Sequence, residues 1–144
     1  MSRNDPIQNF RFRVEIDGIT QAGFSEVIMP DATIDVIEYR EGSEQTHVRK
    51  LSGLTKFSNI ILKWGITDSM DLYDWVKSVM DSGASGNRKN MSIVLIDEEG
   101  NDRMRWNFME AWPVRYKISD LNAMTNQVVF EIIEITFERF SKES

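Results

Sequence analysis

The stretch between residues 57 and 83 constrains the fold most, because it is the one place where the hydrophobic period changes. Ile60, Leu62 and Trp64 occupy alternate positions, which predicts a strand with one strongly apolar face. Gly65 ends this run. Apolar residues then recur at the spacing of one helix face, which predicts a helix over about 68–82.

The predicted helix has a start, an apolar stripe and a stop. Asp68 is expected to be the N-cap, with Asp71 in the first turn near the positive end of the helix dipole. Gly83 is expected to end the helix. The expected packing anchors follow the i, i+3, i+4, i+7 spacing and are Leu72, Trp75, Val76 and Val79. We expect the strands of the protein to be arranged around this helix.

Period-two alternation is clearest in Asn9–Gly18, where apolar and polar residues alternate throughout. The Asp17-Gly18 pair at its end predicts a tight hairpin to a second strand at Ala22–Ile28. Met91–Ile96 and Arg103–Met109 predict another hairpin, in which Met91–Ile96 is a central strand.

Val128–Phe140 is the longest candidate strand. Its apolar face changes along its length, which suggests a strand that bends from one layer to another. The predicted fold class is therefore mainly β, a β-sandwich or barrel-like fold with one α-helix. With 144 residues, a single domain spanning 1–144 is expected.

Two consecutive segments do not fit an isolated domain easily. Thr33–Arg40 is a predicted strand with apolar residues on both faces, which fits local irregularity or burial by another subunit. Glu41–Lys56 is polar and long, and it is predicted as an extended loop over about 41–56 with a short strand near Thr46–Leu51. A solvated hairpin and a contact arm for another copy of the protein both fit this segment.

Composition excludes several functions. The net charge of −6 argues against a general nucleic-acid binder, which needs a basic surface. The chain has no cysteine, which excludes disulfides and thiolate metal sites. It also has no apolar run of membrane-spanning length and no apolar signal-peptide core, so we expect assembly in a cytosol.

The residues do not predict catalysis. His47 is the only histidine and has no cysteine or glycine-flanked serine to activate, so a hydrolase triad is not expected. The acidic run Asp97–Asp102 lacks the spacing of a calcium-binding EF-hand loop and is interpreted as a solvated turn. We predict no catalytic residue, no cofactor and no metal, and hence a protein that is not an enzyme.

An ordered set of segments carries a family resemblance. These are NFRFRVEIDG, QAGFSEV, IEYREG, VRKLSGLTKFSNIILKWGIT, LYDWV, RWNFMEAWPVRY and LNAMTNQVVFEIIEI, which together run from about Asn9 to Ile135. In this order the chain resembles the tail tube proteins of contractile phages and of phage-like contractile injection systems. The resemblance implies a fold related to the hemolysin-coregulated protein of type VI secretion.

The resemblance also implies a function. Proteins of this family form hexameric rings that stack into a hollow tube, and strands from several subunits line the lumen as one sheet. A surrounding sheath contracts and drives the tube through a target envelope. The implied partners are other copies of the chain, a sheath protein, baseplate or spike and terminator proteins, and effector cargo in the lumen. The implied location is the cytoplasm of the producing cell, then the phage tail or injection particle.

We therefore predict a structural inner-tube protein, with a tube-end adaptor or an effector-carrying ring as the alternative. By the resemblance, the segment Glu41–Lys56 reaches the neighbouring ring. The candidate ring-to-ring contacts are the charged residues and the histidine in and beside that segment: Glu38, Arg40, Glu41, His47, Arg49, Lys50 and Lys56.

Overall fold

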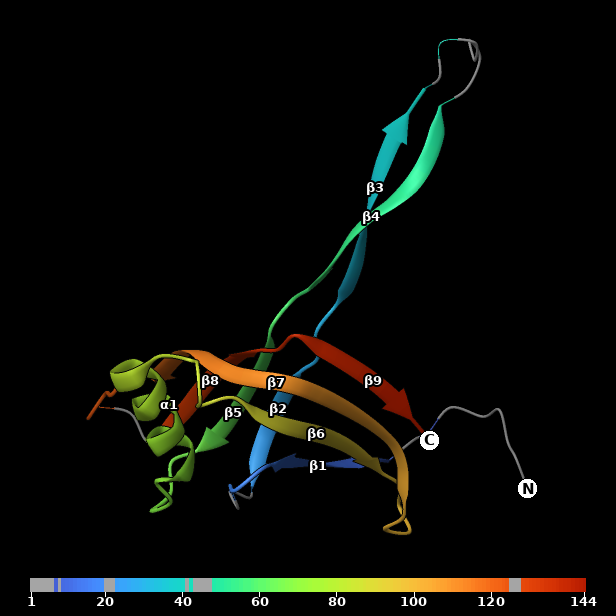
Figure 1. Ribbon diagram of the computed structural model, residues 1–144. Helices are drawn as coiled ribbons and strands as arrows, with labels where there is room; N and C mark the ends of the chain where they lie inside the picture. Colours follow the sequence, from blue (N-terminus) through green and yellow to red (C-terminus); the bar gives the residue numbers. More distant parts are fainter. Residues whose placement is uncertain (1–6, 8, 20–22, 41, 43–47, 125–127) are drawn as a thin grey trace.

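The computed structural model of the chain describes residues 7, 9–19, 23–40, 42, 48–124 and 128–144 (Figure 1). This part of the chain forms nine strands and one helix, which confirms the prediction of a mainly β fold with a single helix. In chain order they are β1 (Arg11–Ile16), β2 (Phe24–Ile28), β3 (Ala32–Tyr39), β4 (Arg49–Phe57), β5 (Ile60–Gly65), α1 (Asp71–Ser82), β6 (Lys89–Ile96), β7 (Asp102–Ile118), β8 (Phe130–Thr136) and β9 (Arg139–Glu143).

The body of the protein has two antiparallel layers that share strand β7. In the first, the β1 layer, the strand order is β1-β6-β7-β9. In the second, the β2 layer, the order is β2-β5-β8-β7. β1 and β2 end the path of paired strands without pairing with each other, so the described strands form a sandwich that is not closed into a barrel.

Strand β7 passes from one layer to the other at its middle. Glu110 has φ of 58°, a left-handed conformation that is uncommon outside glycine. Pro113 has no N–H to donate to the ladder, and the register with β8 shifts between Pro113 and Arg115. The first half of β7 therefore pairs with β6 and β9, and the second half pairs with β8.

The prediction that Val128–Phe140 forms one long strand is wrong, but the segment does pass from one layer to the other, as β8 in the β2 layer and β9 in the β1 layer. β8 ends at Thr136, and β9 starts at Arg139 and pairs with the first half of β7. The break occurs because Phe137 turns into the core, where its ring lies 4.9 Å from that of Phe108 and 5.2 Å from that of Phe57. β7, by contrast, crosses between the layers as one strand.

The hairpin predicted at Asp17-Gly18 does not pair the first two strands. Among the residues described there, the turn closes one bridge, between Ile16 and Ile19. β1 pairs with β6 in one layer and β2 pairs with β5 in the other. Each strand has an apolar face to bury, and the two layers place those faces on opposite sides of a common core.

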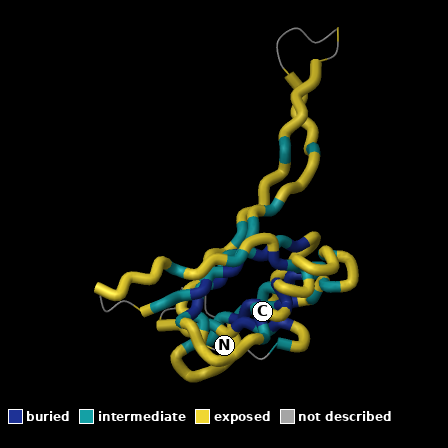
Figure 2. Tube along the Cα trace, turned by 90° about the vertical axis from the view of Figure 1, so that its left-hand side faces the viewer, coloured by how far each residue is buried: buried dark blue, intermediate teal, exposed yellow. Residues whose placement is uncertain are grey.

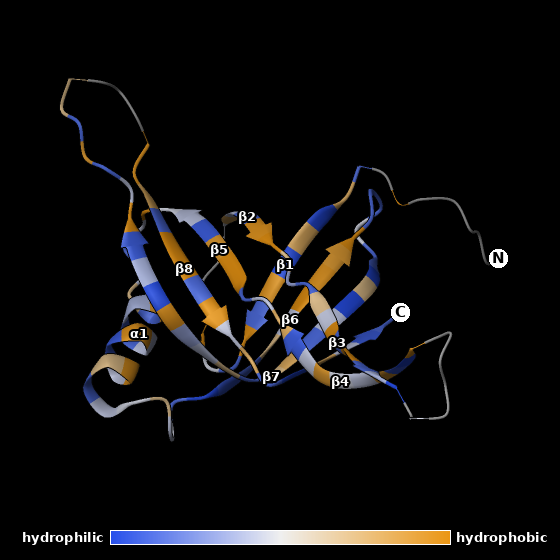
Figure 3. Ribbon diagram, turned by 90° about the horizontal axis from the view of Figure 1, so that it is seen from above, coloured by the Kyte–Doolittle hydropathy of each residue, from blue (hydrophilic) through white to orange (hydrophobic). Residues whose placement is uncertain are grey.

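The core lies between the two layers and is closed by α1 (Figure 2). It takes every second residue of the strands, as the alternation in the sequence predicts, and Figure 3 shows hydrophobic and hydrophilic positions following one another along these strands. Its fully buried side chains include Ile60, Leu62, Trp64, Leu72, Phe108, Ile133 and Ile135. Burial of each such side chain contributes about 1.5–3 kcal/mol, so these residues dominate the stability of the body.

Helix α1 begins later than predicted, at Asp71, and Asp68 is not its N-cap. Met70 precedes the helix and makes no capping hydrogen bond through its side chain. Upstream, the Oγ1 atom of Thr67 accepts a hydrogen bond from the N–H of Ser69 at 3.3 Å. Such local side-chain-to-backbone bonds compete with helical ones and favour a turn before the helix.

Candidate assembly surfaces

Strands β3 and β4 form a hairpin that projects from the body, which we call the arm (Figure 1). β2 leads into β3 and β4 leads into β5, so the arm extends two neighbouring strands of the β2 layer. The loop predicted over about 41–56 is wrong from residue 49 onward, because Arg49–Phe57 is a strand that pairs with Ala32–Tyr39. Residues 41 and 43–47 lie outside the described part of the chain.

Most of the arm is exposed (Figure 2), and it carries exposed apolar side chains. They are Ile34, Val36, Ile37, Leu51 and Leu54, and their exposed fractions run from 49% to 73%. An isolated two-stranded hairpin is at best marginally stable in water. Large apolar residues gathered on one projection mark a surface that a partner covers.

Close packing within the arm shapes it near its middle. The register shifts between Ile34 and Val36, which is a β-bulge or irregularity. Opposite it, a Cβ atom on Gly53 would lie 3.1 Å from Cγ1 of Ile37 and 3.2 Å from Cβ of Asp35. Glycine therefore lets these two side chains lie directly over the β4 backbone.

The predicted contact residues divide between the two ends of the arm. In the outer half, Glu38 lies opposite Lys50 and Tyr39 lies opposite Arg49. Nearer the body, Lys56 forms an ion pair with Asp35 at 3.1 Å. Arg40 follows β3 and is exposed, whereas Glu41 and His47 lie outside the described residues.

The charges of the arm balance, whereas those of the whole chain do not. Its described part has four cationic side chains, Arg40, Arg49, Lys50 and Lys56, and two anionic ones, Asp35 and Glu38. The whole chain carries a net charge of −6. The sequence between β3 and β4 adds Glu41 and Glu44, so the whole arm carries four cations and four anions and is close to neutral.

The four expected helix anchors face the core to different degrees. Leu72, Trp75 and Val76 are buried, and Val79 is half-buried against the core. The Nε1–H of Trp75 donates a hydrogen bond to the backbone carbonyl of Asn87 at 2.7 Å. This bond ties α1 to the loop that follows it.

The β2 layer ends at two strand edges. Within the described residues, β2 pairs only with β5, and the second half of β7 pairs only with β8. The outer edges of these two strands therefore present backbone N–H and C=O groups without a partner strand. Such edges are sites where another chain can add to a sheet.

The outer face of the β2 layer mixes charged and apolar residues, and sequence analysis did not assign it. Lys63 lies over the ring of Phe130, 4.4 Å from its centre. Glu134 accepts a hydrogen bond from Nδ2 of Asn59 at 2.7 Å and lies 4.0 Å from Arg115. Knowing which face of each strand points outward requires the register, which the alternation alone does not provide.

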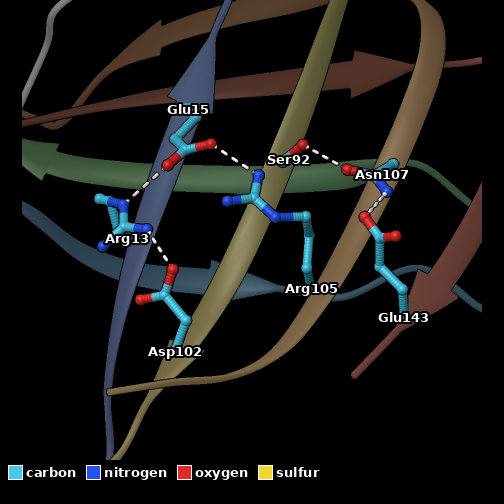
Figure 4. A network of polar contacts seen from close by, with 7 residues as sticks. All are labelled: Arg13, Glu15, Ser92, Asp102, Arg105, Asn107 and Glu143. Atoms are coloured by element: carbon cyan, nitrogen blue, oxygen red, sulfur yellow. Dashed lines mark hydrogen bonds and ion pairs between the residues drawn. The ribbon is translucent and has the colours of Figure 1, made fainter. Parts of the chain in front are cut away.

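A network of polar side chains joins the strands of the β1 layer (Figure 4). Glu15 accepts hydrogen bonds from Arg105 at 2.7 Å and from Arg13 at 2.8 Å. Arg13 also donates to Asp102 at 2.9 Å. The bonds from Arg105 and then Arg13 lower the pKa of Glu15 below its ordinary value. Beside them, Ser92 donates a hydrogen bond to Asn107 at 2.6 Å, and Asn107 donates one to Glu143 at 2.8 Å.

Replacing Glu15 with glutamine is expected to lower the free energy of unfolding by about 0.5–1 kcal/mol at pH 7, because the paired side chains are partly exposed. The pKa of Glu15 is lower in the folded state, so its contribution is present above the ordinary pKa of 4.5 and is lost as pH falls. Urea denaturation at pH 7 and pH 3 measures this difference. Glu99→Gln, in an exposed turn, is the matched control and should have no such effect.

Glu131 is the one buried charged residue among those that the structure describes, with 7% exposure. The hydroxyl of Tyr116 donates a hydrogen bond to its carboxylate. The ring of Tyr73, from α1, meets that of Tyr116 edge-on at 5.8 Å. Burial, followed by the bond to Glu131, raises the pKa of Tyr116 above its ordinary value.

Replacing Tyr116 with phenylalanine is expected to cost about 1–3 kcal/mol, because it removes the donor to a buried carboxylate. The pKa of Tyr116 is raised in the folded state, so its contribution is present below the ordinary pKa of 10.0 and is lost as pH rises above it. Denaturation at pH 7 and pH 10.5 should show that the variant loses less stability than the wild type over this interval. An equal loss in both would contradict the assignment, and Tyr73→Phe serves as the control.

The described residues do not converge into a reactive site. No three metal-ligating side chains lie together among them. An open pocket of about 770 Å³ runs along β1, and it combines apolar side chains such as Phe12 and Phe24 with members of the polar network. Among the same residues, no helix has the length and hydropathy needed to span a membrane. The prominent features are surfaces and strand edges.

Such a fold, with a projecting apolar arm and open sheet edges, is that of a structural assembly protein. Residues 8–141 match the family model described as T4-like virus tail tube protein gp19. The chain belongs to this tail tube family, and its role is that of a structural tail tube protein. This confirms the family resemblance drawn from the sequence segments.

Solved structures agree with this placement. A chain of the sheath-tube complex of PVC, an extracellular contractile injection system, is 26% identical with a TM-score of 0.84, covering 98% of this chain and 93% of that one. A chain of the PVC sheath/tube terminator structure is also 26% identical with a TM-score of 0.82, covering 99% and 100%. Both PVC structures are in the extended state.

A more distant structure shares the fold alone. Hcp1 from Salmonella typhimurium is 16% identical with a TM-score of 0.54, covering 92% of this chain and 85% of that one. A comparison with curated protein sequences gave no match.

Proposed function

We propose that this chain is a single-domain inner-tube subunit that forms hexameric rings, and that these rings stack into a hollow tube. The arm is the observation that carries the proposal. It exposes five large apolar residues and has no cover within the described part of the chain. A subunit of a polymer can cover these apolar residues by burying its arm against another copy.

The β2 layer supplies a way to close a ring. Its four strands alternate in direction, so the end strands β2 and β7 run antiparallel to each other. The ring axis, which relates each subunit to the next by a rotation, runs roughly along the strands of the β2 layer. Such a rotation leaves the direction of each strand unchanged. The β2 edge of one subunit then lies antiparallel to the β7 edge of the next, and the alternation continues from subunit to subunit. When the ring closes, the backbone groups of every such edge have a partner strand.

This closure assigns the two layers to the inside and the outside of the tube. The β1 layer and the core lie on one face of the β2 layer. The other face, which includes Lys63, Phe130 and Glu134, lines the lumen. The polar network around Glu15 and Arg105 lies on the outside of the tube. That surface is available to a sheath protein, in line with the sheath-tube complex of the PVC relative.

The arm makes the contact between rings. Its apolar residues are buried against the next ring, and its charged side chains, among them Arg40, Arg49 and Lys50, fix the register between rings. Assembly takes place in the cytoplasm of the producing cell, with a baseplate or spike at one end of the tube and a terminator at the other. Catalysis has no part in this function.

A second function is favoured by one observation. A chain of the PVC sheath/tube terminator structure aligns with 99% of this chain at 26% identity. The same fold therefore also suits a ring that ends a tube, or an adaptor ring that holds effector cargo in its lumen. Such a ring would form hexamers but would not extend into long stacks.

Light scattering and negative-stain electron microscopy of the purified chain test the proposal. We expect a ring mass of six subunits and, at higher concentration, tubes of stacked rings. A chain that stays monomeric at every concentration and salt tested would contradict both candidates. Rings that never stack, even at high concentration, would favour the tube-end candidate.

A further inference from the structure

A second apolar projection lies on the connection from β7 to β8. It carries four apolar residues with exposed fractions from 46% to 91%. We call them the tip cluster: Ile118, Leu121, Met124 and Val128. At the base of this connection, Ser119 donates its N–H to the carbonyl of Phe130 at 2.8 Å and accepts the N–H of Phe130 at its Oγ at 2.9 Å. The base of the projection is therefore fixed to the sheet.

The arm and the tip cluster lie at opposite ends of the β2 layer. At one end, Ile28 pairs with Ile61, and Ile61 pairs with Glu134. The arm begins just beyond Ile28. At the other end, Glu131 pairs with both Trp64 and Ile118, and the chain leaves toward the tip cluster. Figure 1 shows the arm and the chain that leaves the end of β7 as separate projections from the body.

We propose that the tip cluster of one subunit packs against the arm of a subunit in the adjacent ring. This inference rests on the proposed stacking of rings and names the surface that receives the arm. In a stack of identical rings, one end of each ring meets the opposite end of the next, so each contact joins two different surfaces of the same chain. The tip cluster and the arm are the two apolar projections at those ends.

The two surfaces match in chemistry. The arm offers Val36 and Leu54, which are 62% and 73% exposed, and the tip cluster offers Leu121 and Met124, which are 76% and 91% exposed. Burying such residues together removes apolar area from water on both sides.

The contact cannot form within one ring. Suppose that β2 of one subunit pairs with the second half of β7 of its neighbour. The arm of the first subunit then lies at the end of the sheet where this half of the neighbour's β7 starts. The tip cluster of the second subunit follows the other end of that strand. A full strand length then separates the two surfaces, so only a subunit of another ring can bring them together.

The absence of cysteine from the chain permits a direct test. The full chain with Val36→Cys and Leu121→Cys together is assembled and then oxidised. We expect a ladder of disulfide-linked subunits on non-reducing gels. An equal mixture of the two single variants should give linked dimers and no ladder. The control pair, Glu99→Cys with Leu121→Cys, places a thiol in the acidic turn and should not give a ladder.

A non-covalent variant provides a second measurement. Leu121→Gln with Met124→Gln removes apolar surface without adding charge, and both positions are exposed, so the subunit should fold. We expect rings of wild-type mass and loss of stacked tubes in micrographs. Normal stacking of this variant, or a double-cysteine protein without a ladder, would overturn the inference while rings remain. Absence of rings in the wild type would overturn the proposed function itself.

Discussion

Replacing Ile37 with aspartate and Leu51 with lysine is expected to abolish tube formation while the subunit stays folded. The two residues are cross-strand partners in the arm and are about half exposed. An opposite-charge pair at facing positions supports a hairpin, so the arm itself is retained. The net charge of the chain does not change. What is lost is the apolar surface that, in our proposal, the arm buries against another copy.

The measurement is particle mass by light scattering, combined with electron microscopy under conditions in which the wild type forms tubes. Thermal unfolding of the variant monitors the body, and its midpoint should match that of the wild-type monomer. Met80→Gln is the matched control, because Met80 is 64% exposed on α1 and is not part of the arm. Tubes of normal length from the arm variant would show that the arm is not a contact surface.

Replacing Trp75 with alanine is expected to lower the free energy of unfolding by about 3–5 kcal/mol. The indole is 3% exposed and packs in the core, so its removal leaves a large cavity beside the β strands. The variant also loses the hydrogen bond from Nε1 to the carbonyl of Asn87. For a domain with a total stability of about 5–15 kcal/mol, this is a large fraction.

Urea denaturation, monitored by circular dichroism, measures this change in the free energy of unfolding. Trp75→Phe retains most of the ring and loses the hydrogen bond, so it should cost less than the alanine variant. Lys77→Ala changes an exposed position on the same helix and serves as the control. A near-neutral result for Trp75→Ala would show that α1 is peripheral to the stability of the subunit.

The sequence predicts local periodicity well and long-range pairing poorly. Alternation identified the buried faces of β5 and β1, and the 3.6 spacing identified Leu72, Trp75 and Val76 as residues of one helix face. The hairpin predicted at Asp17-Gly18 fails because the partner of β1 is β6, about 80 residues away in the chain. Alternation specifies which face is apolar but carries no information about the neighbouring strand.

The arm shows a different limit. Its exposed apolar residues look like core residues when the chain is considered alone, and the two-sided pattern of Thr33–Arg40 left local irregularity and subunit contact equally open. Its second strand begins at Arg49, within a segment that is polar in the sequence. Polar composition usually indicates a loop, but a hairpin that binds another chain can carry polar and charged residues on its strands.

The sharing of β7 between the two layers has a consequence for the order of events in assembly. Neither layer is complete until β7 is in place, and its partners β6, β8 and β9 come from a long stretch of chain. We therefore expect the body to fold in one cooperative step rather than layer by layer. Pairings between distant segments, such as β1 with β6, make that step slow, because chain closure must precede the stabilising contacts. Newly made subunits would thus spend time with strand edges unprotected, so the rate of folding, and not only the affinity of the finished surfaces, sets how many of them reach a growing tube.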